Sequence, residues 1–102
     1  RYADHAEAHD KTLQEIVAER AAALSRVSRG LERRIGHARA LRREAQEAPR
    51  GPERERRAHE FNRARKDAAT WLWYLIVQRE ANGLTDHSEI RKLYPLPEPW
   101  TP

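Results

Sequence analysis

His5 and His9 are the side chains whose type and spacing come closest to a metal site. On a helix, residues four apart lie on one face, so both imidazoles could bind one divalent ion, and Asp4, Glu7 and Asp10 surround them. Two ligands do not complete a coordination sphere, and such a pair in an alanine-rich stretch is more typical of a solvated helix start. We expect no metal and no cofactor.

No residue pattern typical of an enzyme is present. The 102 residues include no cysteine, which removes thiolate nucleophiles, thiolate metal ligands and disulfides together. The chain has no glycine-rich phosphate loop, no nucleophile elbow and no His-Glu-x-x-His pattern. Asp67 and Glu80 flank an apolar segment, but they are more simply surface or ion-pair residues. We expect a non-catalytic protein without catalytic residues.

Arginine is abundant enough in this chain to form a ligand-binding surface. It supplies 17 of the 20 basic residues, an excess that GC-rich coding also produces. From residue 26 to residue 66, 14 basic and 6 acidic side chains give a balance of +8, against −4 elsewhere. Such a surface could neutralise phosphates of a nucleic acid or another polyanion. This hypothesis names Arg33, Arg34, Arg39, Arg42, Arg43, Arg50, Arg54, Arg56 and Arg57.

The competing interpretation of these arginines is a solvated surface of helical ion pairs, such as Arg43 with Glu47 and Arg56 with Glu60. Phe61 is the one aromatic residue among them, so stacking of unpaired bases has little support. We favour the ion-pair interpretation and keep polyanion binding as the second hypothesis.

The most distinctive segment is residues 71–77, Trp-Leu-Trp-Tyr-Leu-Ile-Val, which we call the aromatic belt. Seven consecutive apolar residues point in every direction around a helix, so one neighbouring helix covers only part of them. We expect Leu72, Leu75 and Ile76 to face the first helix, and a second copy or another protein to cover the rest. The predicted partner-binding residues are Trp71, Trp73, Tyr74, Val77 and Trp100.

Cover from within the same chain is the competing hypothesis for the belt. Burying a large apolar side chain is worth about 1.5 to 3 kcal/mol, so some cover is favoured. A third helix and the proline-rich tail could supply it, and both sources of cover can coexist. The covering residues would be Leu84, Ile90, Leu93, Tyr94, Leu96 and Trp100.

The scaffold that positions these residues is predicted to be all-α: a long antiparallel helical hairpin, resembling a coiled coil. A heptad pattern over residues 3–48 predicts the first helix, bent near Gly30. Its a positions are Val17, Leu24, Leu31, Ala38 and Ala45, and its d positions are Leu13, Arg20, Val27, Arg34 and Leu41. Residues 49–52 form the loop, with Gly51 as N-cap and Pro52 opening the second helix, 53–82.

The rest of the chain should turn back after Gly83, whose left-handed conformation caps the second helix. Asp86 and Glu89 have the spacing of a capping box and predict a short third helix over 87–94. Four prolines then favour an extended tail over 95–102. In the hairpin, residue i should face about residue 100 − i. This register predicts an apolar core at the open end, which is the end away from the loop. It also predicts a thinly packed, basic loop end.

Together these patterns predict one helical domain, 1–102, that is soluble and cytoplasmic. The longest apolar run, seven residues, is far below the roughly 18 of a membrane span. The chain contains no methionine, so we expect further residues before Arg1. The function that the residues favour is a non-catalytic oligomerisation or protein-interaction module, with a homodimer or a heterologous protein as partner.

Overall fold

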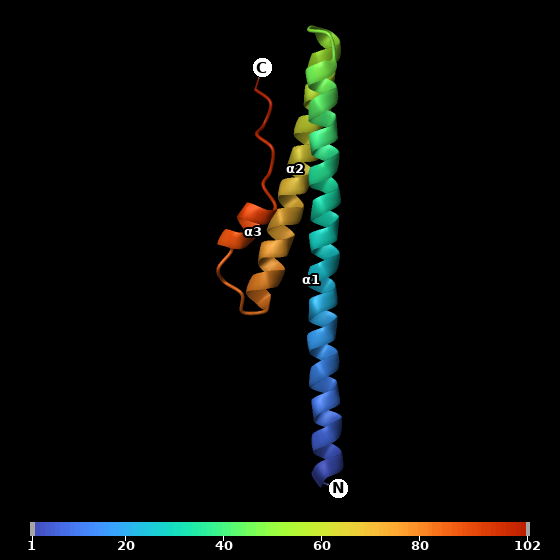
Figure 1. The fold of residues 1–102 in the computed structure, drawn as a ribbon, viewed down its shortest axis with the longest axis vertical. Coiled ribbons are helices and arrows are strands. Elements are labelled where there is room, and N and C mark those ends of the chain that lie inside the picture. The colour runs from blue at the N-terminus through green and yellow to red at the C-terminus, as the bar shows by residue number, and fades with distance from the viewer. Residues whose placement is uncertain (1, 102) are drawn as a thin grey trace.

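The computed structural model describes the backbone of residues 2–101 and the side chains of residues 6–101. It contains three helices, α1 (Tyr2–Glu47), α2 (Pro52–Ala81) and α3 (Ser88–Leu93). Figure 1 shows α1 and α2 as an antiparallel hairpin, with the chain after α3 turning back toward the loop end. The molecule measures 75 × 20 × 15 Å. The predicted all-α helical hairpin is confirmed, and the part of the chain described here contains no helix apolar enough to span a membrane.

The loop between the long helices follows the local signals of the sequence. Gly51, with φ 122°, is the N-cap of α2, Pro52 occupies its first turn, and Glu53 lies where the helix dipole favours negative charge. Arg54 reaches back over the loop and donates to the carbonyl of Ala48 at 2.6 and 2.9 Å. The guanidinium therefore closes the carboxyl end of α1, whose carbonyls have no helical partner.

Gly83 ends α2, as its position predicts. Its φ is 80°, its N–H donates to Glu80 at 3.0 Å, and the N–H of Leu84 donates to Arg79 at 2.9 Å. These two bonds define a Schellman motif. The predicted capping box of α3 does not form, because His87 is its N-cap, Asp86 accepts bonds from the N–H and hydroxyl of Ser88, and Glu89 lies 3.6 Å from Lys92.

Two ion pairs fix the register of the hairpin. Arg57 lies 3.3 Å from Glu44 and Arg34 lies 3.2 Å from Asp67, so residue i of α1 faces residue 101 − i of α2. The predicted register is correct within one residue. Because α2 ends at Ala81, which lies opposite residue 20, residues 2–20 of α1 lie at or beyond its end. We call this segment the overhang, and at 1.5 Å per residue it is about 28 Å long.

The apolar core runs along the whole paired length of the hairpin. Its main cluster joins Leu31 and Ile35 of α1 to Ala68 and Leu75 of α2 and to Ile90 of α3. The prediction of thin packing at the loop end is wrong. Buried residues continue to the loop because small alanines let the helices approach closely and leave space for one large ring. These residues are Ala38, Ala45, Ala48, Ala58 and Phe61.

Candidate interaction surfaces

The outer side of the aromatic belt is exposed. Trp73, Tyr74 and Val77 keep 60%, 43% and 41% of their surface, although the buried Leu75 lies among them. The Tyr74 ring links the two indoles, with its centroid 5.7 Å from that of Trp73 and 5.8 Å from that of Trp71. The belt therefore presents a continuous aromatic surface, and three of its predicted partner-binding residues lie on it.

Trp71 lies differently from the prediction, because it packs against α1 beside Gly30. A Cβ atom added to Gly30 would lie 2.4 Å from Cζ3 of the indole, so the ring needs the space that glycine leaves. The guanidinium of Arg34 lies 3.7 Å from the ring centroid and also pairs with Asp67. Gly30 is therefore a contact point of the two helices. The register places 30 opposite 71, which is the signal that could have predicted this contact.

Trp100 also lies away from its predicted place in the belt. Its N–H donates to the side-chain oxygen of Asn62 at 2.9 Å, and the amide of Asn62 donates to its carbonyl at 3.1 Å. Asn62 precedes Trp71 by nine residues, which is about 14 Å along the helix axis. The grouping of Trp100 with the belt in one contact surface is therefore wrong. Backbone pairing with Asn62 decides its position, and the sequence gives no sign of that pairing.

Arginine side chains hold the tail against both long helices. Proline has no N–H, so a proline-rich segment offers carbonyls that need donors from elsewhere. The donors are Arg39 to Pro95 at 3.3 Å, Arg65 to Pro97 at 2.6 Å and Arg42 to Glu98 at 2.6 Å. Of the predicted covering residues, Ile90, Tyr94 and Leu96 pack on the core, whereas Leu84 and Leu93 are exposed. Cover from within the chain therefore reaches the core but leaves the outer belt open.

Most of the arginines proposed for polyanion binding have partners within the chain. Arg39 and Arg42 hold the tail, Arg54 caps α1, and Arg34 pairs with Asp67. Arg56 pairs with Glu53 and Glu60, both at 2.9 Å, and Arg57 pairs with Glu53 and Glu44. Arg33, Arg43 and Arg50 are exposed and form no ion pair with the side chains described, 6–101, so the predicted pair of Arg43 with Glu47 is absent. The predicted pair of Arg56 with Glu60 is confirmed.

The arginines shift the pKa of an acidic partner. Hydrogen bonds from Arg56, and then from Arg57, hold the pKa of Glu53 below its ordinary value of 4.5. The pKa of Arg56 is raised in return. Arg34, Arg56 and Arg57 are therefore paired with acids, which reduces the local field that a polyanion would meet, whereas Arg39, Arg42 and Arg54 bond to carbonyls and keep their charge unmatched.

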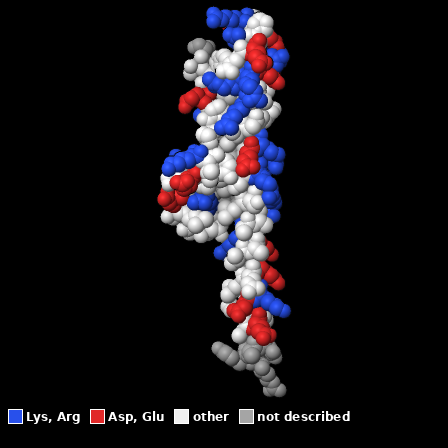
Figure 2. Space-filling model, viewed as in Figure 1, with Lys and Arg blue, Asp and Glu red and all other residues white. Residues whose placement is uncertain are grey.

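The overhang has a different character. Every side chain described from residue 6 to residue 22 is exposed, including Leu13, Ile16 and Val17 at 48%, 38% and 65%. Four acids against two bases give residues 6–20 a balance of −2. Figure 2 shows Lys and Arg gathered over the paired part of the hairpin, while acidic side chains stand along the overhang. The heptad seam of α1 thus continues for several turns without a helix opposite.

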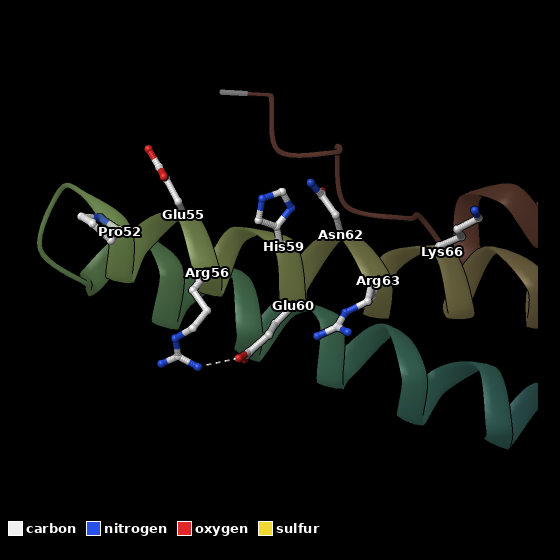
Figure 3. Close-up of a pocket in the computed structure, with 8 residues that line it drawn as sticks. All are labelled: Pro52, Glu55, Arg56, His59, Glu60, Asn62, Arg63 and Lys66. Carbon is white, nitrogen blue, oxygen red and sulfur yellow. Dashed lines mark hydrogen bonds and ion pairs between the residues drawn. The ribbon is translucent and has the colours of Figure 1, made fainter.

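A surface hollow of about 790 Å³ lies along the outer face of α2 (Figure 3). Its lining comes from that one helix, and its ion pair of Arg56 with Glu60 points away from the tail (Figure 3). The hollow is an open depression and does not enclose a ligand from two sides. The lining residues are Pro52, Glu55, Arg56, His59, Glu60, Asn62, Arg63 and Lys66.

The structure describes the side chain of one member of the histidine pair. His9 is exposed on the overhang, and the His5 side chain lies outside the described residues. Within the described part of the chain, no group of three His, Asp or Glu side chains is placed to hold a metal ion. The open end of the hairpin, with the overhang and the outer belt, is therefore the surface with the clearest unmet packing.

Comparison with known proteins identifies no relative of this chain. No family model, no curated protein sequence and no solved structure matches the chain.

Proposed function

We propose that this chain is a helical oligomerisation module, and that its open end binds a second copy of itself. The observation that carries the proposal is the overhang. It continues the heptad seam of α1 past the end of α2, and it keeps Leu13, Ile16 and Val17 exposed. The outer belt, with Trp73 and Tyr74, lies at the same end of the hairpin.

The energetics favour a partner for the overhang. A helix of fewer than about 12 to 15 residues is marginal in water, and most helical stability in proteins comes from packing of an apolar face. The overhang has 19 residues, and each of its described side chains, 6–20, is exposed, so its helical form draws little support from packing within the chain. A helix laid along Leu13 and Val17 supplies that face and removes their apolar surface from water.

Polyanion binding is the weaker of the two functions. Six of the nine arginines proposed for it interact within the chain, and the tail occupies two of them. A gel-shift titration at low and moderate salt tests it. The absence of binding at low salt removes this hypothesis, and salt-sensitive binding supports it.

Light scattering during size exclusion, over a series of protein concentrations, tests the oligomerisation proposal. We expect the molar mass of the chain to rise above that of a monomer as its concentration rises. The double variant L13E/V17E should remain a monomer, because each substitution places a charge on the seam. The matched control A8E/A22E adds the same charges on the opposite side of α1 and should associate like the unmodified chain.

The outcomes separate clearly. A monomer at every concentration up to the high micromolar range overturns the oligomerisation function. Equal loss of association in both double variants shows a general effect of added negative charge and removes the overhang as the contact surface.

A further inference from the structure

We propose that two copies pair their overhangs as an antiparallel coiled coil with its two-fold axis beside Glu15. Residue i of one copy then faces residue 30 − i of the other. This inference rests on the oligomerisation function proposed above and names the geometry of the partner. Three observations carry it: the heptad phase, the exposed apolar residues of the overhang and the order of its charges.

The heptad phase is fixed by burial within the hairpin. Leu31, Ala38 and Ala45, all at position a, are fully buried, so the same phase places Val17 at a and Leu13 at d on the overhang. In an antiparallel pair, position a of one helix packs beside position d of the other. Val17 of one copy then meets Leu13 of the second copy, and the two-fold axis repeats the contact.

The neighbouring positions agree with the same alignment. Ile16, at position g next to the axis, comes close to its own counterpart in the second copy, so all three exposed apolar residues gather at the centre. Glu15 is at position f and faces away from the seam, so its two copies do not oppose each other across it. Toward the loop end the pairing stops at about Arg20, because beyond it α2 covers the seam of α1 and Leu24 already packs on the hairpin core.

The charges of the overhang select this alignment. Asp10 occupies an a position and Arg20 a d position, so each is a charged side chain on the seam. With 30 − i, Asp10 of each copy faces Arg20 of the other. Asp10 and Arg20 of one chain are separated by about 15 Å along the helix, beyond the Debye length of about 8 Å at physiological salt. Their mutual attraction is therefore realised only between copies.

Other alignments leave these charges unmatched. A shift by one heptad to 37 − i sets Arg20 against Val17 and Asp10 against Val27. A shift to 23 − i sets Asp10 against Leu13. A parallel pair sets Asp10 against Asp10 and Arg20 against Arg20, which repels at both layers.

Charge reversal tests the alignment. D10R and R20E should each weaken the dimer about tenfold, because each replaces two symmetric attractions by repulsions. The double variant D10R/R20E should restore the dissociation constant to within about threefold, because the pairs are re-formed with their signs exchanged. E15R is the control for net charge. It should change association little, and its combination with R20E should show no recovery.

Cross-linking gives a second readout, since the chain has no cysteine of its own. In an oxidised mixture of L13C and V17C, we expect the mixed disulfide to form in preference to either self-linked product. Disulfides need Cα atoms about 4.4 to 6.8 Å apart. In this alignment residue 13 of one copy and residue 13 of the other are offset by four residues, about 6 Å along the axis, and the same holds for residue 17. Links between identical positions are therefore disfavoured.

Each outcome decides something specific. If the chain dimerises but D10R/R20E does not recover the dissociation constant, the antiparallel alignment is overturned and the oligomerisation proposal is kept. The same conclusion follows if L13C links mainly to L13C. A chain that stays monomeric overturns both. Recovery together with the mixed disulfide supports the proposed dimer.

Discussion

Replacing Gly30 by alanine should destabilise the hairpin, although the same change at Gly36 should stabilise it. Both glycines lie inside α1, where alanine gains about 0.5 to 1 kcal/mol of helix propensity. At Gly36 an added Cβ meets no atom within 4 Å, so the full gain is expected. At Gly30 the Cβ would lie 2.4, 2.8 and 3.1 Å from three ring atoms of Trp71.

The ring has to move for the Gly30 variant to fold. Overpacking of this kind costs about 1 to 3 kcal/mol. Moving the indole also weakens its contact with Arg34, and a cation–π contact at a partly exposed site is worth about 0.5 to 1 kcal/mol. Set against the propensity gain, G30A should lower the free energy of unfolding by about 0.5 to 3.5 kcal/mol.

A double-mutant cycle separates the clash from other effects of the substitution. In a W71A background the ring is gone, so G30A should stabilise by about the same amount as G36A. Urea unfolding followed by far-ultraviolet circular dichroism measures each free energy, at one protein concentration for all variants because association contributes to stability. If G30A has the same effect with and without Trp71, the packing of this ring on the α1 backbone is refuted.

Three further predictions concern the tail, the loop and the end of α2. N62A should raise the hydrogen-exchange rate of the Trp100 amide about fivefold, since it removes a bond worth about 1 kcal/mol, and an unchanged rate in nuclear magnetic resonance would contradict this bond. Because the folded pKa of Glu53 is depressed, its stabilising contribution is present above 4.5 and is lost as the pH falls through the folded pKa. E53Q should therefore show a smaller loss of unfolding free energy between pH 6 and pH 3 than the unmodified chain, and equal losses in urea titrations at the two pH values would speak against the ion pairs. G83A, at φ 80°, should destabilise by about 1 kcal/mol in thermal or urea unfolding, and a stabilising effect would show that this cap is not left-handed.

The sequence by itself determined the hairpin, its limits and its register. Gly51 with Pro52, and Gly83 after α2, act through backbone preferences that extend over a few residues, so no distant contact is needed to interpret them. The heptad phase is equally local, and burial of Leu31 and Ala38 agrees with it. With one short loop, the end of the first helix then fixes which residues face each other.

The tertiary structure alone decided where Trp71 and Trp100 lie and which partners the arginines take. An indole or a guanidinium can reach several neighbours, and the choice depends on free space and unpaired carbonyls on elements far apart in the chain. Gly30 leaves space for Trp71, Asn62 pairs with the backbone of Trp100, and the tail carbonyls attract Arg42. Backbone preferences act within a few residues, whereas these long side chains respond to whatever the fold brings within reach, and that is known only once the helices and the tail are in place.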